Sequence, residues 1–173
     1  GDPAGIGPEV ILGAWARLQQ DHRAPRAFVV GGPELLRSTA EALRIDCPIV
    51  PIGDPAEAIS ACDAGLPVLA EPDGRSSPGH CTVDGARLAL ASLEQGAKLA
   101  VSGVAAGLVT APIAKSALAA IGWDFPGQTE FLAHVCGRPS QDAVMMLAGP
   151  SLRAVPLTVH VALSRVPGLI SAE

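Results

Sequence analysis

The segment LVTAPIAKS at residues 108–116, continued by FPGQTEFL at residues 125–132, carries the clearest local signals in the chain. The apolar run at residues 107–109 predicts a short buried strand. A polar turn ends this strand, and the composition of residues 113–121 is typical of a helix. Gly122 follows, where a left-handed residue commonly closes a helix. This part of the chain therefore predicts a strand–turn–helix unit.

Polar side chains gather at the starts of two predicted helices. The first turn presents Thr110 and Lys115, and the second presents Gln128 and Thr129, with Thr129 as the expected N-cap. Helix N-termini attract anions, because their free N–H groups and their dipole favour negative charge. These turns predict a site for a phosphorylated or carboxylated small molecule. Corners of this composition also occur in α/β proteins without any ligand, so a purely structural role stays open.

The rest of the chain alternates strands and helices. A Gly/Pro-rich loop, GDPAGIGPE at residues 1–9, leads into a helix that continues towards Gln20. Further predicted strands cover residues 26–30, 49–52, 66–70, 143–148 and 152–159, the last two forming a hairpin, and further helices cover residues 33–43 and 83–102. The order favours an α/β fold with an open, mostly parallel sheet and flanking helices. Because ligands bind beyond the carboxyl ends of such strands, the first loop, the Thr110 turn and His160 are expected to converge.

Composition excludes several classes of protein. The chain has 173 residues and a net charge of −5 without a basic cluster, which argues against nucleic acid as a partner. No apolar run approaches the roughly 18–20 residues of a membrane span, and no signal peptide is visible. We expect a soluble cytoplasmic protein. The four cysteines lie far apart without a CxxC motif, so buried thiols are expected rather than disulfides or a zinc ribbon.

Among the four histidines, His160 is the candidate for chemistry. It ends a predicted strand, which is where α/β enzymes place metal ligands or acid–base groups. His22 lies in a polar run and His134 on a predicted helix, so solvated and structural roles are expected for them. His80 follows a Pro-Gly turn in the most linker-like loop. One histidine alone does not make a metal site, which needs at least two further ligands.

Five blocks of sequence carry a family resemblance. They are GDPAGIGPE at residues 1–9, LVTAPIAKSAL at 108–118, FPGQTEFLA at 125–133, VMMLAGPSLR at 144–153 and PLTVHVAL at 156–163. In order and spacing they resemble the 4-hydroxythreonine-4-phosphate dehydrogenases of pyridoxal phosphate biosynthesis. Close relatives in that group act on other phosphorylated hydroxy acids. The resemblance runs across nearly the whole chain.

The resemblance implies a homodimeric subunit with the architecture of isocitrate and isopropylmalate dehydrogenases and a site in the cleft between two domains. Residues 1–125 would belong to the first domain, and residues 126–173 would begin an incomplete second one. The implied reaction is oxidation of 4-phosphooxy-threonine by NAD (or NADP), followed by decarboxylation. A divalent metal (Zn, Mg, Co or Mn) would bind the substrate hydroxyl and lower its pKa.

Carried over by position, His160 matches a metal-binding histidine of the family. Gln128 and Thr129 match a substrate-contacting His-Thr pair, and Lys115 matches a lysine after the TAP turn, for which we expect an electrostatic role. Gln128 departs from the family histidine, and it cannot carry a charge or shuttle a proton near neutral pH. This departure leaves open a relative with an altered substrate.

Family members are about twice as long as this chain. The resemblance therefore implies the N-terminal half of such an enzyme, with the other two metal histidines and most of the nicotinamide site in the other half. We expect this isolated chain to be inactive. The alternative is a non-catalytic remnant that acts at most as a phosphate-binding or assembly module. Ala114, Val159 and Ala162 also depart from the family pattern.

Overall fold

Three short apolar strands form a parallel sheet in the computed structural model. The structure describes residues 1–21, 23–73, 77–158 and 161–170. The strand β3 (Leu66–Ala70) lies between β1 (Val29–Gly31) and β2 (Ile49–Ile52). Both pairings are parallel. In a parallel sheet, helices cover both faces of the central strand. This is why β3 is a continuous apolar run, LPVLA.

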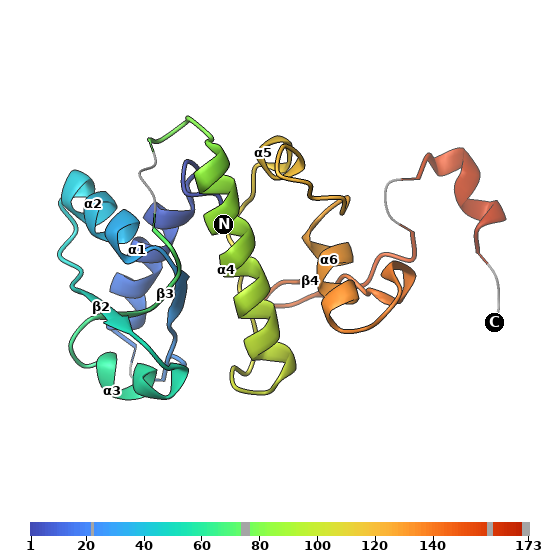
Figure 1. The fold of residues 1–173 in the computed structure, drawn as a ribbon. Helices are drawn as coiled ribbons and strands as arrows, with labels where there is room; N and C mark the ends of the chain where they lie inside the picture. Colours follow the sequence, from blue (N-terminus) through green and yellow to red (C-terminus); the bar gives the residue numbers. More distant parts are fainter. Residues whose placement is uncertain (22, 74–76, 159–160, 171–173) are drawn as a thin grey trace. The chain divides into compact units, whose positions relative to one another are not determined.

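Helices lie on both sides of this sheet (Figure 1). Val68 is fully buried in a cluster with Leu12 of α1 (Gly7–Leu18) and with residues of α2 (Pro33–Leu43). Leu69, the next residue of β3, packs in a different cluster with half-buried Leu99 of α4 (Val83–Val101). Successive side chains of a strand point to opposite faces. The alternation of Val68 and Leu69 therefore places α1 and α2 on one face and α4 on the other.

The predicted α/β fold with a parallel sheet and flanking helices is confirmed, and several boundaries agree with the sequence pattern. β2, β3 and α2 span the predicted residues, and α4 ends one residue early. The remaining predicted elements are shorter in the structure, with α1 ending at Leu18 and β1 starting at Val29. The polar loop after β2 also contains a 3-10 turn (Pro55–Glu57) and a short helix, α3 (Ala58–Ala61).

The predicted strand at residues 107–109 is wrong. The segment has no regular secondary structure and no strand partner among the described residues, and Val109 is 97% exposed. Leu108 packs against α4, since a Cβ added to Gly96 would lie 2.8 Å from its Cδ1. An apolar run becomes a strand only where a neighbouring edge offers hydrogen bonds. The following helix, α5 (Lys115–Ala119), is also shorter than predicted.

Gly122 ends α5 as the sequence predicts. Its φ is +90°, and the N–H of Trp123 donates to the Leu118 carbonyl at 3.1 Å. The N–H of Gly122 donates to the Ala119 carbonyl at 3.1 Å. These two bonds form a Schellman motif, in which the left-handed residue turns the chain back onto the last helical carbonyls.

The chain divides into two compact units, Gly1–Asp124 and Phe125–Glu173. The second unit contains α6 (Gln128–Val135) and a hairpin of β4 (Leu147–Ala148) and β5 (Arg153–Ala154). A 3-10 turn (Ser140–Asp142) and a 3-10 helix (Leu163–Gly168) complete it. The division into domains at residue 125 stays a prediction.

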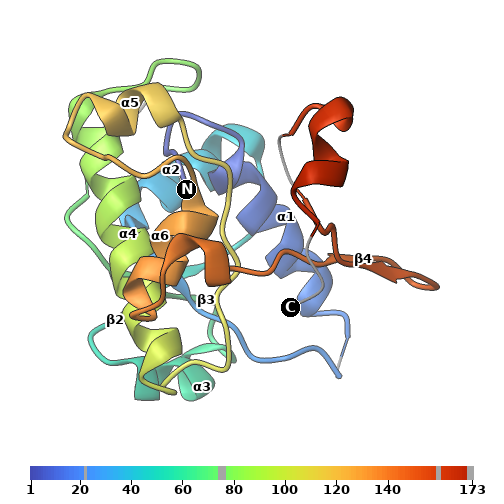
Figure 2. The same ribbon diagram turned by 90° about the vertical axis from the view of Figure 1, so that its right-hand side faces the viewer.

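Two predictions for the second unit need correction, and one is confirmed. Thr129 is not the N-cap of α6: Gly127 holds that position, and Thr129 is the second helical residue. The predicted hairpin forms, with Leu147 opposite Ala154 and the Gly149 N–H donating to the Leu152 carbonyl at 2.7 Å. Its strands are shorter than predicted, and Figure 2 shows them as a narrow two-stranded ribbon.

The four thiols are all free, but only two of them are buried. Cys47 and Cys62 belong to the core, whereas Cys81 and Cys136 are exposed, so the expectation of buried thiols is wrong for the second pair. Burial raises the pKa of Cys47, with a further contribution from the charge of Asp46. No helix among the described residues is long and apolar enough to cross a bilayer.

Substituting Leu12 tests the importance of the cluster under α1. Leu12→Ala removes a fully buried side chain, and we expect the free energy of unfolding to fall by about 2–5 kcal/mol. Val10 lies on the same helix with 55% exposure, so Val10→Ala is the matched control and should change stability by about 0.5 kcal/mol or less. Urea denaturation followed by circular dichroism measures both. Equal losses in the two variants would contradict this view of the core.

Candidate functional site

The loop of residues 1–6 is held in shape by Asp2. The Oδ1 atom of Asp2 accepts a hydrogen bond from the Ala4 N–H at 2.9 Å, and its carbonyl oxygen accepts one from the Gly5 N–H at 3.1 Å. An Asp-Pro dipeptide favours such a turn, because the carboxylate bonds the backbone two residues on. The loop then enters α1 at Gly7, with Pro8 in the first helical turn, where its missing N–H costs nothing.

This loop packs directly on the TAP turn. The Asp2 N–H donates to the Pro112 carbonyl at 2.9 Å. A Cβ added at Gly1 or Gly7 would lie 2.5 Å or 3.1 Å from the Cβ of Ala111. Glycine at both positions therefore permits the close approach of the two segments. The predicted convergence of the first loop with the Thr110 turn is confirmed, whereas His160 lies outside the described residues.

Asp2 also contacts the thiol of Cys81, just before α4. The Cys81 Sγ donates to the Asp2 Oδ2 at 3.2 Å, and this hydrogen bond raises the pKa of the thiol. The same carboxylate thus fixes its own loop and the start of α4. Cys81 is therefore a structural contact of the loop.

A small cavity lies beneath this loop, alongside β1. Its volume is about 40 Å³, and its lining includes Gly1, Gly31, Leu88, Ser92 and Ala111. Ser92 is the one buried polar side chain among the described residues, with 8% exposure. The volume suffices for water but not for a phosphorylated amino acid. This cavity is therefore part of the packing under the loop and not a substrate pocket.

A larger hollow of about 290 Å³ lies beside α4. Asp73, Asp84 and Arg87 contribute its charges. The Arg87 guanidinium already pairs with Asp84 at 3.1 Å, and Asp73 accepts a hydrogen bond from the Glu34 backbone N–H. The remaining charge is negative. Such a hollow repels a phosphate or carboxylate, so it does not fit an anionic substrate.

Asp73 serves instead as a remote cap for α2. The N-cap position of α2 is Gly32, which has no side chain to satisfy the first helical N–H groups. The carboxylate of Asp73, from the loop after β3, fills this role by bonding Glu34. A Cβ on Gly32 would collide with that carboxylate. An anion-binding helix terminus at the end of β1 is thus already occupied by the protein itself.

The predicted site residues lie at the starts of two helices. Lys115 is the first residue of α5 and is exposed, in the first unit. Gln128 and Thr129 are the first two residues of α6, in the second unit, and Thr129 is exposed. Thr110 is exposed in the segment before α5. A common site for these residues stays a prediction, as does the role of His160.

Gly127 and an aromatic contact define the start of α6. Gly127, its N-cap residue, is extended with φ −167° and provides no side-chain hydrogen bond. Phe131 anchors the helix through an edge-to-face contact with Phe125, with ring centroids 5.4 Å apart. The helix dipole there favours an anion, although Glu130 in the same turn opposes it. Gln128 and Thr129 lie in this first turn.

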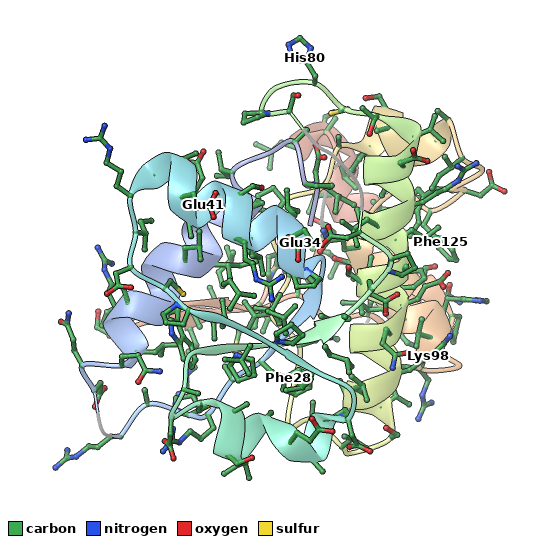
Figure 3. The ribbon with its side chains drawn as sticks, turned by 60° about the vertical axis from the view of Figure 1, so that its left-hand side comes forward. Phe28, Glu34, Glu41, His80, Lys98 and Phe125 are labelled. Carbon is green, nitrogen blue, oxygen red and sulfur yellow. The ribbon has the colours of Figure 1, made fainter. Side chains whose placement is uncertain are left out.

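The described part of the chain contains no group of three His, Cys, Asp or Glu residues that could hold a metal ion. His80 is exposed and points away from the protein at the tip of its loop (Figure 3). His134 packs against Phe125, with ring centroids 5.3 Å apart, which agrees with the structural role expected for it. The described residues alone do not fit a metal centre.

Sequence reasoning missed three residues that organise this region. Asp2 precedes a proline, and this Asp-Pro pair is the local turn signal for the loop. Asp73 lies in a Pro-Asp-Gly loop, and no local pattern connects it to α2. Ser92 is a polar residue on the covered face of α4, and the interruption of an apolar stripe was its only signal.

Comparison with known proteins identifies a family and several relatives. The family model described as "Pyridoxal phosphate biosynthetic protein PdxA" matches residues 23–173. A 4-hydroxythreonine-4-phosphate dehydrogenase of Erythrobacter litoralis is 57% identical over 99% of this chain and 51% of its own length. One of Zymomonas mobilis is 46% identical over 93% of this chain and 47% of its own.

Solved structures show the same fold. The 4-hydroxythreonine-4-phosphate dehydrogenase of Burkholderia phymatum superimposes with a TM-score of 0.80 at 30% identity, covering 94% of this chain and 48% of that one. The Klebsiella pneumoniae protein of that name gives a TM-score of 0.80 at 30% identity. This chain spans about half the length of these relatives. It belongs to the PdxA family of pyridoxal phosphate biosynthetic proteins.

Proposed function

We propose that this chain is the N-terminal half of a dehydrogenase that oxidises 4-phosphooxy-threonine or a closely related phosphorylated hydroxy acid, with loss of carbon dioxide. The observation that carries the proposal is the 57% identity to a 4-hydroxythreonine-4-phosphate dehydrogenase over almost the whole chain. The packing of the first loop on the TAP turn supports it, because it brings two of the resembling blocks together.

The described residues suit substrate binding rather than the redox step. Lys115 is an exposed cation after the TAP turn and would attract a substrate phosphate or carboxylate. Gln128 and Thr129 would donate hydrogen bonds to the same anionic substrate from the start of α6. The first loop would fix the position of the TAP turn through Asp2 and so preserve the orientation of the segment that leads to Lys115.

The proposed oxidant is NAD or NADP, which would accept hydride from the carbon that bears the substrate hydroxyl, while the hydroxyl loses its proton. A divalent metal is proposed as the second cofactor, and its site needs ligands beyond the described residues, which hold no set of three. His160 is the one ligand that this chain is proposed to contribute. We further propose that the whole protein is a homodimer. This chain alone would then bind substrate weakly and turn over nothing.

A second candidate function rests on Gln128. The family histidine at this position could exchange a proton with the substrate, whereas an amide only donates and accepts hydrogen bonds. A phosphorylated hydroxy acid that needs no proton transfer at this point would suit Gln128 better. The substrate would then differ from 4-phosphooxy-threonine while the site stays the same.

The isolated chain should show no turnover. Purified chain is mixed with 4-phosphooxy-threonine, NAD and Mg²⁺, Mn²⁺, Co²⁺ or Zn²⁺ in turn, and absorbance at 340 nm reports NADH. We expect no rate above the enzyme-free control, because an incomplete ligand set does not hold a catalytic metal. The Erythrobacter litoralis relative is the positive control. Metal-dependent turnover by the isolated chain would contradict the proposal that half of the site is elsewhere.

Lys115 is tested in a full-length protein made by joining this chain to the part of the Erythrobacter litoralis relative that it does not match. Lys115→Ala should lower kcat/KM by about tenfold or more, because one charge-assisted hydrogen bond is worth about 1.5–3 kcal/mol. Lys98→Ala removes an exposed lysine from α4 and is the control. Equal activity in both variants would remove Lys115 from the site.

Gln128→His in the same full-length protein distinguishes the two candidate substrates. If 4-phosphooxy-threonine is the natural substrate, the histidine should raise kcat, because it can shuttle a proton near neutral pH. Steady-state rates from pH 6 to 9 measure the effect, with Gln128→Asn as the control that keeps an amide. An unchanged or lower rate would indicate a different phosphorylated acid.

A further inference from the structure

Three rings of the second unit pack together at the start of α6. Phe125 lies two residues before the N-cap position, and its ring meets that of Phe131 edge to face, with centroids 5.4 Å apart. The ring of His134 also packs on Phe125, tilted by 48° with centroids 5.3 Å apart. We call this cluster the aromatic clasp. Through it, Phe125 contacts α6 at two points.

The aromatic clasp connects the chain before α6 to one face of the helix. Phe131 and His134 are three residues apart, so they are neighbours on the helix surface. Phe131 is 5% exposed, Phe125 is half-buried and His134 is exposed. In a hydrophobic staple, an apolar residue before the N-cap packs on the fourth helical residue and fixes the angle at which the chain enters the helix. Phe131 is that fourth residue, and His134 adds a second contact one turn further on.

The start of α6 depends on contacts of this kind. Gly127, the N-cap residue, provides no side-chain hydrogen bond, and α6 has only eight residues. Helices of this length are marginally stable in water unless tertiary contacts hold them. Pro126 restricts the backbone between Phe125 and Gly127, so a displacement of the Phe125 ring moves the N-cap residue with it. The aromatic clasp therefore decides where the first turn of α6 lies.

This first turn carries two of the residues proposed to bind substrate. Gln128 and Thr129 directly follow the N-cap residue, so both move with the entry angle of the helix. A displacement of about 1 Å in a group that positions substrate can cost about a hundredfold in rate. The contacts that fix the entry angle are therefore contacts that the binding residues need.

We propose that the aromatic clasp positions Gln128 and Thr129 for the substrate, with Phe125 and His134 as positioning residues that act through the start of α6. What the first turn binds rests on the proposed function. The hold of the clasp on that turn follows from the ring contacts alone.

Substitutions of Phe125 and His134 test the proposal in the full-length protein described above. Phe125→Leu keeps an apolar side chain but removes the ring, whereas Phe125→Tyr keeps the ring. His134→Ala removes the second contact, whereas His134→Phe keeps it. Phe28→Leu is the matched control, because Phe28 is also half-buried but packs against the cluster of Leu69 in the first unit. The melting temperature shows whether each variant is folded.

Phe125→Leu and His134→Ala should each raise the KM for 4-phosphooxy-threonine by about three- to tenfold, which is on the order of what one aromatic pair contributes. The value of kcat should change by less than about twofold, because binding rather than the chemical step is weakened. Phe125→Tyr, His134→Phe and Phe28→Leu should keep the KM of the unsubstituted protein. A purely structural role would lower the melting temperature and kcat while KM stays unchanged, and that result overturns the proposal.

Hydrogen exchange separates the aromatic clasp from the choice of substrate. Amides of residues 131–135 should exchange about three- to tenfold faster in Phe125→Leu, because loss of an aromatic pair makes local opening easier. In Phe125→Tyr they should exchange at the unsubstituted rate. If the unsubstituted protein turns over no 4-phosphooxy-threonine, the proposed function is wrong, and the exchange rates still decide the hold of the clasp. Equal exchange in all variants overturns the proposal.

Discussion

The burial of β3 on both of its faces is the constraint on which the first unit depends. Val68 contacts the cluster under α1 and α2, and Leu69 contacts the cluster with α4, so one five-residue strand holds two layers of helices together. The two parallel neighbours satisfy its backbone groups. Because parallel strands end at the same edge, the loops after β1 and β3 lie at one end of the sheet. Gly32 and Asp73 meet there, and the carboxylate caps α2.

The first loop is also held by a single residue that makes several contacts. One carboxylate, that of Asp2, bonds the Ala4 N–H and the Cys81 thiol, while the Asp2 backbone bonds Pro112. Three segments distant in sequence are thereby joined. The cavity under the loop holds only water-sized molecules, and the hollow beside α4 is negatively charged. The chain matches about half of the length of each relative.

The second unit buries few of its apolar side chains. Phe131 and Ala133 are its buried apolar residues among those described, whereas most of the hairpin side chains remain exposed. A folded unit normally covers such residues with other parts of its own sheet. The exposed hairpin and the segment before α5, with Val109 97% exposed, share this property.

The sequence by itself determined the alternation of strands and helices, the parallel character of the sheet, the hairpin and the family. These follow from local periodicity, Gly and Pro punctuation, and motif blocks, all of which are contained within short windows. The tertiary structure alone decided three outcomes. Residues 107–109 pair with no strand among the described residues, Gly127 rather than Thr129 is the N-cap of α6, and Asp73 caps α2. Each of these outcomes depends on which partner reaches a backbone group from elsewhere in the chain. No window of sequence contains that partner, because hydrogen-bond satisfaction is a property of the folded arrangement.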